Sequence, residues 1–197
     1  MKKLSKKWQI FIITIVVLIG SFYGYYKINN RNAFEEMYNS YFNVLPLSAI
    51  DNMGQIKPIR RDDQGFDVKR LYYKRKVNDS DIGIFLINFN NKKKIYLISS
   101  TLIAEGVYLE INYLYNMDNH ELRNTVTFRG ENVPRADDEN KQKRELLEKY
   151  NISKEYLQEK SDELLNTVLT DWKRYSGSSY SKDNMGTITI EKDEILR

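Results

Sequence analysis

The chain contains no cysteine among its 197 residues. This absence excludes disulfide bonds, thiolate metal ligands and a lipid-modified amino-terminal cysteine. An exported domain without disulfides is typical of a bacterial surface that lacks routine oxidative folding, and unlike most small secreted eukaryotic modules. Its stability must therefore come from a packed core.

Histidine is almost as scarce, because His120 is the only one and lies in a predicted tight turn. A histidine metal site or a Ser-His-Asp triad cannot be assembled from one imidazole within one chain. Phosphate-binding, dinucleotide-binding and G-x-S-x-G motifs are also absent. The acids at 137–139 precede a predicted helix and lack calcium-loop spacing, so we interpret them as a helix cap. The sequence thus predicts no enzyme, no cofactor and no metal.

One long apolar run stands out, from Trp8 to Tyr26. Nine of the ten residues at 10–19 are Ile, Val, Leu or Phe, each worth about −0.3 to −0.6 kcal/mol at a helix centre in a bilayer. At about 1.5 Å per residue the run matches a hydrocarbon thickness of about 30 Å. A cleaved signal has a shorter apolar core and then small residues at the cut site, whereas this core continues into Gly20-Ser21-Phe22-Tyr23-Gly24-Tyr25-Tyr26 with no A-x-A pattern. We predict an uncleaved membrane anchor that includes Trp8, Ile10, Phe11, Ile13, Val17, Ile19 and Tyr26.

The charges around this run predict its orientation. Four lysines precede it and two basic residues follow: Lys2, Lys3, Lys6, Lys7, Lys27 and Arg31. The positive-inside bias therefore places the amino terminus in the cytoplasm. We expect residues 1–27 to form a cytoplasmic tip and anchor in the cell membrane, and residues 28–197 to form one extracellular domain. The four leading lysines equal the net charge of +4, leaving 27 basic against 27 acidic residues, so no nucleic-acid partner is expected.

This neutral domain is divided in charge. Residues 57–94 hold eleven basic and five acidic residues, whereas residues 95–171 hold nine basic and fifteen acidic residues. The two segments are therefore +6 and −6. They could complement each other within one packed domain, which we favour, or match a charged partner.

Periodicity predicts an α+β fold for this domain. Apolar residues at three- and four-residue spacing indicate a helix over 33–43, and we expect it to pack on the domain because its acids suit an anionic membrane poorly. Period-two alternation of β-branched and aromatic residues predicts a sheet. The expected strands are 66–77, 82–89, 94–103, 106–117 and 121–129. Their short connections require an antiparallel meander.

Three further elements complete this prediction. A charged helix is expected over 137–150, and a longer amphipathic helix begins at Ser153 and stops at Gly177. The strand 186–192 is expected to join a sheet edge. The strand 82–89 is apolar on both sides, which predicts a central position with cover on each face.

The strands 106–117 and 121–129 each have one apolar and one polar side. The apolar sides predict the core, so the polar side is either solvated or covered by a polar partner. We select Glu110, Asn112, Arg123 and Arg129 on this polar side as candidate partner-binding residues. The alternative is that the helix from Ser153 covers this face.

The layout resembles the TipC family of immunity proteins. The resemblance rests on the lysine-rich start, the single span, the juxtamembrane Asn-Ala-Phe-Glu-Glu-Met-Tyr segment, the meander, and a late helix ending in Trp172 before Ser-Lys-Asp-Asn-Met-Gly-Thr-Ile-Thr-Ile. It implies a membrane-anchored protein of Gram-positive bacteria that binds and neutralises an LXG-class toxin exported by the type VII secretion system. A secreted protein toxin is then the expected partner, together with the lipid bilayer.

Two other functions remain open at this point. A cell-wall enzyme would need two carboxylates converging in a cleft, drawn from Asp118, Glu121, Asp137, Asp138 and Glu139. A structural subunit of a secretion or conjugation apparatus would need a large exposed apolar patch.

Overall fold

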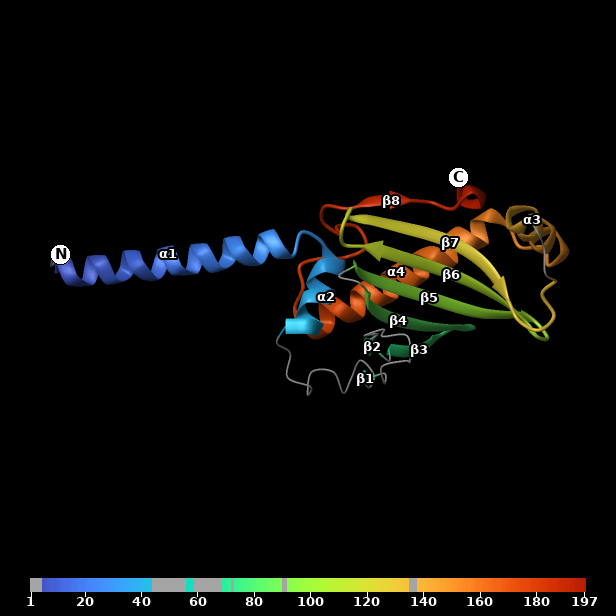
Figure 1. The fold of residues 1–197 in the computed structure, drawn as a ribbon, viewed down its shortest axis with the longest axis horizontal. Helices are drawn as coiled ribbons and strands as arrows, with labels where there is room; N and C mark the ends of the chain where they lie inside the picture. The colour runs from blue at the N-terminus through green and yellow to red at the C-terminus, as the bar shows by residue number, and fades with distance from the viewer. Residues whose placement is uncertain (1–4, 44–55, 59–68, 72, 90–91, 135–137) are drawn as a thin grey trace.

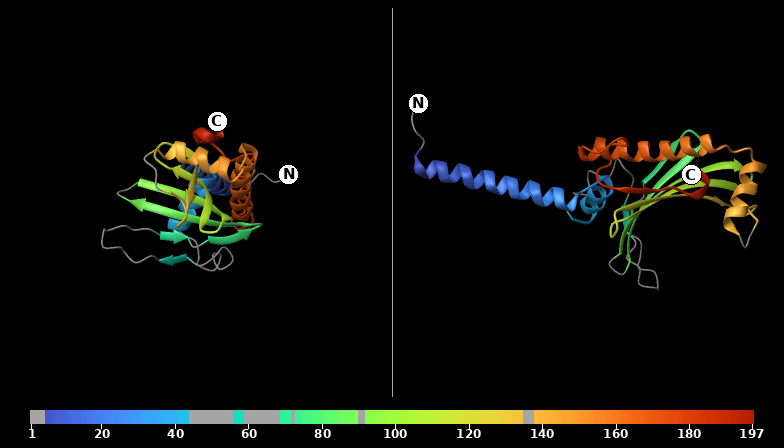
Figure 2. Two further views of the ribbon diagram at one scale, coloured as in Figure 1. Left: turned by 90° about the vertical axis from the view of Figure 1, so that its right-hand side faces the viewer. Right: turned by 90° about the horizontal axis from the view of Figure 1, so that it is seen from above.

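A computed structural model describes residues 5–43, 56–58, 69–71, 73–89, 92–134 and 138–197 (Figure 1). A long helix precedes an α+β domain in which a curved sheet carries one long helix on one face (Figure 2). The helices are α1 (Lys6–Asn29), α2 (Ala33–Asn43), α3 (Glu139–Lys149), α4 (Lys154–Ser176) and the 3-10 helix η2 (Glu194–Leu196). The strands are β1 (Ile56–Pro58), β2 (Lys69–Leu71), β3 (Tyr73–Val77), β4 (Ser80–Phe89), β5 (Lys92–Ala104), β6 (Val107–Asn116), β7 (Glu121–Arg129) and β8 (Thr189–Glu191).

Helix α1 extends away from the domain, and none of its residues is buried (Figure 1). Its 24 residues are long and apolar enough to cross a membrane. The predicted anchor side chains are all exposed, from Trp8 at 58% to Tyr26 at 42%. A soluble protein rarely leaves so many large apolar side chains in water, so this helix fits the predicted membrane anchor. Of the lysines that predict its orientation, Lys2 and Lys3 lie outside the described residues.

The main sheet has the strand order β3-β4-β5-β6-β7-β8. Its first four pairings are antiparallel, which confirms the predicted meander. Strand β8 joins the far edge as expected but runs parallel to β7. A parallel partner needs a long crossover, and helices α3 and α4 provide it here.

Two strand predictions need correction. The single strand predicted at 66–77 is divided into β2 and β3, with residues 66–68 and 72 outside the described ranges. Strand β2 lies beside β4, as β3 does, but also pairs with β1 in a separate two-stranded sheet. The strand predicted at 82–89 corresponds to β4, which is second from the sheet edge and not central, because it lies between β3 and β5.

The core lies between one face of the sheet and helices α2 and α4. The buried side chains on that face come from alternate strand positions, as the period-two pattern predicts. They include Ile82, Ile84, Ile95, Leu97, Leu109, Ile111, Tyr113, Tyr115, Leu122 and Val126. Helix α4 adds Leu157, Leu164, Leu165, Val168 and Trp172. Helix α2 packs on the domain, as expected, and its Phe34 ring stacks on Tyr115 at 5.1 Å between centroids.

The helix ends follow local sequence signals. Asp138 caps α3 by accepting hydrogen bonds from the backbone N–H groups of Asn140 and Lys141, both at 3.0 Å. The Ser153 hydroxyl caps α4, and Gly177 ends it with a left-handed φ of 70°. Asp137, the first acid of the predicted cap, lies outside the described residues. The capping role predicted for this acidic cluster is confirmed at Asp138.

Candidate functional site

Among the residues that the structure describes, no helix lies on the face of the main sheet opposite α2 and α4, here called the open face (Figure 2). Helix α4 contacts β5 and β6 from the core side, so it does not cover the polar side of those strands. The alternative that the helix from Ser153 covers this face is therefore wrong, and partner binding there stays a prediction. The open face includes Tyr96, Ile98, Ser100 and Leu102 of β5, Tyr108, Glu110, Asn112 and Leu114 of β6, and Arg123, Thr125, Thr127 and Arg129 of β7.

Three of the four candidate partner-binding residues form one hydrogen-bonded group on this face. The Arg129 Nε lies 2.8 Å from a carboxylate oxygen of Glu110. The Asn112 amide accepts a hydrogen bond from the Tyr96 hydroxyl at 2.7 Å and donates one to Thr127 Oγ1 at 3.1 Å. Glu110 is 8% exposed and Asn112 is 2% exposed, so both are held in fixed positions by their neighbours.

Burial has an electrostatic consequence at Glu110. Removal of its carboxylate from water raises the pKa of Glu110, and this outweighs the opposing effects of the Arg129 guanidinium and the Thr127 hydroxyl. The folded chain therefore holds a carboxylate whose ionisation it disfavours. A glutamate that weakens the fold at this point needs a reason other than stability.

A Glu110→Gln substitution is expected to stabilise the chain at neutral pH by about 0.5–1 kcal/mol. Folding raises the pKa of Glu110 above its ordinary value of 4.5, so folding favours the protonated carboxyl. The stability that Glu110 gives the folded chain is therefore complete below pH 4.5, and it is lost as pH rises through the folded pKa. Thermal unfolding of the full chain in detergent, from about pH 4 to about pH 8, measures this difference. The melting advantage of the variant should grow with pH, and a constant or shrinking advantage contradicts the assignment. Glu131→Gln, on the exposed loop after β7, controls for the loss of one charge.

Two exposed apolar side chains adjoin this group. Leu102 is 56% exposed, Tyr108 is 41% exposed, and the two are directly paired across β5 and β6. Tyr108 is also paired with Arg129 on β7. We call Leu102, Tyr108, Glu110 and Arg129 the distal patch, since the β5–β6 turn lies at the end of the sheet far from α1 (Figure 1). Leu102 was not selected from the sequence, although it lies at an even number of residues from Tyr96 and therefore on the same side of β5.

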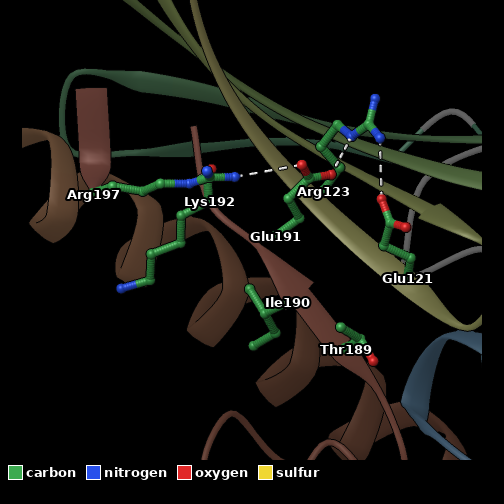
Figure 3. Close-up of a pocket in the computed structure, with 7 residues that line it drawn as sticks. All are labelled: Glu121, Arg123, Thr189, Ile190, Glu191, Lys192 and Arg197. Atoms are coloured by element: carbon green, nitrogen blue, oxygen red, sulfur yellow. Dashed lines mark hydrogen bonds and ion pairs between the residues drawn. The ribbon is translucent and has the colours of Figure 1, made fainter. Parts of the chain in front are cut away.

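The fourth candidate, Arg123, lies apart from this patch. It lines an open groove along the β7–β8 edge together with Glu121, Thr189, Ile190, Glu191, Lys192 and Arg197 (Figure 3). Its guanidinium pairs with Glu191 at 2.7 Å and with Glu121 at 3.2 Å. Glu191 also pairs with Arg197 at 3.4 Å, so both acids of the groove are paired with arginines. Arg123 therefore fixes β8 to β7 more than it offers a free charge.

Asp137 lies outside the described residues, and the other four acids considered for an enzyme lie at two ends of the domain. Asp118 lies in the β6–β7 turn and Glu121 begins β7, both at the end of the domain beside α1, whereas Asp138 and Glu139 begin α3 at the opposite end (Figure 1). Of these four, Glu121 lines the groove, and its partner there is Arg123. Within the described residues, no three His, Asp or Glu side chains are grouped closely enough to hold a metal ion.

A second buried polar cluster joins α1 to the domain. Glu35 and Glu36 of α2 are 3% and 6% exposed. The Glu35 carboxylate lies 2.7 Å from His120 Nδ1 and accepts a hydrogen bond from the Tyr115 hydroxyl at 3.0 Å. Burial is the largest cause that raises the pKa of Tyr115, so this hydroxyl stays a donor.

Glu36 continues the same cluster toward α4 and α1. It accepts hydrogen bonds from Trp172 Nε1 at 3.1 Å and from the hydroxyls of Ser178 and Tyr26. In a sequence, two acids in the first turn of a helix are explained by their favourable interaction with the helix dipole. The sequence alone therefore does not predict that Glu35 and Glu36 form a buried hydrogen-bonded cluster. Except for Tyr26, these partners lie 80 to 142 positions further along the chain. The cluster therefore positions α1 on the domain.

Comparison with known proteins agrees with this architecture. The family described as TipC immunity protein-like matches residues 6–193. Among solved structures, TipC2 from Streptococcus intermedius B196 is similar, with 21% identity and a TM-score of 0.66 over 83% of this chain and 96% of that chain. At that identity the likeness shows the fold alone. No curated protein matches the chain. Because the family match extends from α1 to the strand after α4, this chain belongs to the TipC immunity protein-like family.

Proposed function

We propose that this chain is a membrane-anchored immunity protein that binds and neutralises a secreted antibacterial toxin. The family match over residues 6–193 carries the proposal. In it, residues 1–27 form the cytoplasmic tip and membrane anchor, and residues 28–197 form an extracellular domain. The exposed apolar surface of α1 supports this division, since its side chains need lipid around them. Anchoring restricts the search for an incoming toxin to the cell surface.

The distal patch is the surface that we assign to toxin binding. Interface cores favour aromatic residues and arginine, and they exclude water around a few anchoring side chains. Tyr108 and Leu102 supply exposed apolar area, while the Glu110–Arg129 pair beside them supplies directional charge. Their place at the end far from α1 leaves them accessible above a bilayer (Figure 1).

The mechanism that follows is steric. A protein bound through a rigid sheet face needs no catalytic group to inhibit an enzyme, because it blocks the active site or the path of the substrate. The family and its fold favour this non-enzymatic role. We propose an LXG-class toxin of the type VII secretion system as the partner, acting outside the cytoplasmic membrane.

The test is binding and protection by the full chain. Reconstituted in lipid nanodiscs, it should bind the toxin encoded beside its gene, and its expression should protect cells to which that toxin is added from outside. Absence of both binding and protection overturns the proposal.

The topology is measured in the same cells. Because the chain has no cysteine, Glu131→Cys and Ser5→Cys provide single labelling sites on the two proposed sides of the membrane. A membrane-impermeant maleimide should label only the first of these in intact cells. Labelling at Ser5→Cys would reverse the proposed orientation.

A further inference from the structure

The domain lies directly against the end of α1. Only residues 30–32 separate α1 from α2. The Tyr180 hydroxyl donates to the Asn30 carbonyl at 2.7 Å, and Asn32 forms a backbone bridge to Gly186. Gly186 has a φ of 90°, and a Cβ there would lie 2.4 Å from the Arg31 carbonyl oxygen. The backbone at Gly186 and the backbone at Arg31 are therefore in close contact. If α1 spans a bilayer, this end of the domain lies at the headgroups.

Exposed basic side chains gather at this end of the domain. They come from α1, the α1–α2 connection, the start of β5 and the last turn of α4: Lys27, Arg31, Lys92, Lys93, Lys173 and Arg174. We call these six residues the basic collar. Figure 1 shows that α2 and the end of α4 lie together where α1 joins.

Ring contacts position Lys93 and Lys27, and Lys173 and Arg174 are placed by the packing of the residue before them. The Lys93 ammonium lies 5.7 Å from the centroid of the Tyr38 ring in α2, and the Lys93 carbonyl accepts a hydrogen bond from Met117 N–H in the β6–β7 turn. The Lys27 ammonium lies 5.9 Å from the Tyr180 ring. Lys173 and Arg174 follow Trp172, whose indole donates to Glu36.

The acids at this end do not cancel the collar. Glu35 and Glu36 are buried, and their carboxylates bind His120, Tyr115, Trp172 and Ser178 inside the domain. Among the described residues here, Asp118 and Asp183 are the exposed acids, against six exposed basic side chains. The part of this surface that the structure describes is therefore net positive. In the proposed anchored state, this positive charge lies where the domain meets the lipid. Anchoring by the apolar helix α1 alone does not require such charge.

We infer that the basic collar binds the phosphates of anionic lipids in the leaflet from which the domain emerges. The inference rests on the proposed anchoring by α1. Ammonium and guanidinium groups attract an anionic bilayer within a Debye length, about 8 Å at physiological salt. Because the domain is fixed to α1, this contact sets its tilt and keeps the distal patch directed away from the bilayer.

The experiment measures enrichment of anionic lipid around the full chain. A donor dye is placed at Ser179→Cys, an exposed position in the loop after α4. The chain is reconstituted in nanodiscs that are mainly phosphatidylcholine and contain headgroup-labelled phosphatidylglycerol or headgroup-labelled phosphatidylcholine as acceptor. Energy transfer should be greater to phosphatidylglycerol, and the excess should fall as salt rises from about 0.05 M to about 0.5 M.

A matched pair of variants isolates the collar. Lys92→Gln, Lys173→Gln and Arg174→Gln together should reduce the phosphatidylglycerol enrichment at low salt by roughly fivefold or more. Lys141→Gln, Lys149→Gln and Lys192→Gln remove the same charge from exposed positions outside the collar and should leave it unchanged. Both variants keep the lysines before α1, so attraction at the other leaflet is common to them.

The outcomes separate this inference from the anchoring on which it rests. Equal transfer to both lipids at low salt, or equal losses in the two variants, overturns lipid binding by the collar. If the chain does not co-elute with nanodiscs of either composition, the anchoring itself is overturned. Circular dichroism of both variants confirms that each retains the fold before transfer is compared.

Discussion

Replacing Asn32 with alanine is expected to lower the free energy of unfolding by about 2–4 kcal/mol. The Asn32 side chain is fully buried and works in two directions. Its Oδ1 caps α2 by accepting from the backbone N–H groups of Phe34 and Glu35, both at 3.0 Å. Its Nδ2 donates to the Tyr115 hydroxyl at 2.6 Å and to the Thr187 carbonyl at 3.1 Å. Truncation removes the cap and leaves these buried groups without their partner.

Chemical unfolding of the full chain in detergent, followed by tryptophan fluorescence and circular dichroism together, measures this loss. Trp172 reports on it because its indole is bound to Glu36 in the same cluster. Asn166→Ala is the matched control, since Asn166 is exposed on α4, and a change within about 0.5 kcal/mol is expected there. Asn32→Asp separates the two functions of the side chain, because a carboxylate can still cap α2 but cannot donate. Similar midpoints for Asn32→Ala and Asn166→Ala would show that the junction does not limit stability.

The elements of the fold with local signals could be predicted from sequence. Strands β5 to β7 alternate apolar and polar residues, and the apolar side is the buried one, as at Leu109 and Ile111. Helix α4 carries its stop at Gly177 and its cap at Ser153 within one turn of its ends. These features depend on neighbours a few positions away, so a single sequence contains them.

The elements without such signals could not be predicted. The direction of β8 depends on the path of α3 and α4 between it and β7, and its three residues carry no sign of that path. The burial of Glu35 and Glu36 depends on Tyr115, Trp172 and Ser178, which are far away in sequence. A buried acid and a surface acid have the same local pattern, and only tertiary packing distinguishes them.

The open face was predicted in part for the same reason. Alternation placed Glu110, Asn112 and Arg129 on one side of the sheet, and the structure brings them together. Arg123 is on the same side by alternation, but its partner Glu191 belongs to β8, whose parallel pairing with β7 the sequence did not predict. The exposed pair Leu102 and Tyr108 depends on the register between β5 and β6. Register across strands, more than periodicity within them, decides which residues form one surface.

Truncating Tyr108 to alanine is expected to weaken toxin binding by about 30-fold, equivalent to about 2 kcal/mol. Tyr108 lies between Leu102 and Arg129 in the pairing of three strands, at the centre of the distal patch. An aromatic side chain in that position loses little conformational entropy on binding and carries a large apolar area. Its truncation also removes the apolar surface that keeps water from the Glu110–Arg129 pair in a complex.

The measurement is the dissociation constant of the toxin for the full chain in nanodiscs, with most of the change expected in the dissociation rate. Ile190→Ala is the control, because Ile190 is 44% exposed, close to the 41% of Tyr108, but belongs to β8 outside the patch. Both substitutions remove a half-exposed apolar side chain from a strand, so their unfolding midpoints should change by similar small amounts. A loss of affinity in Ile190→Ala as large as that in Tyr108→Ala would move the binding surface from the open face to the β8 edge. Because the distal patch and the basic collar occupy opposite ends of the domain, the Tyr108→Ala chain should keep its full enrichment of anionic lipid.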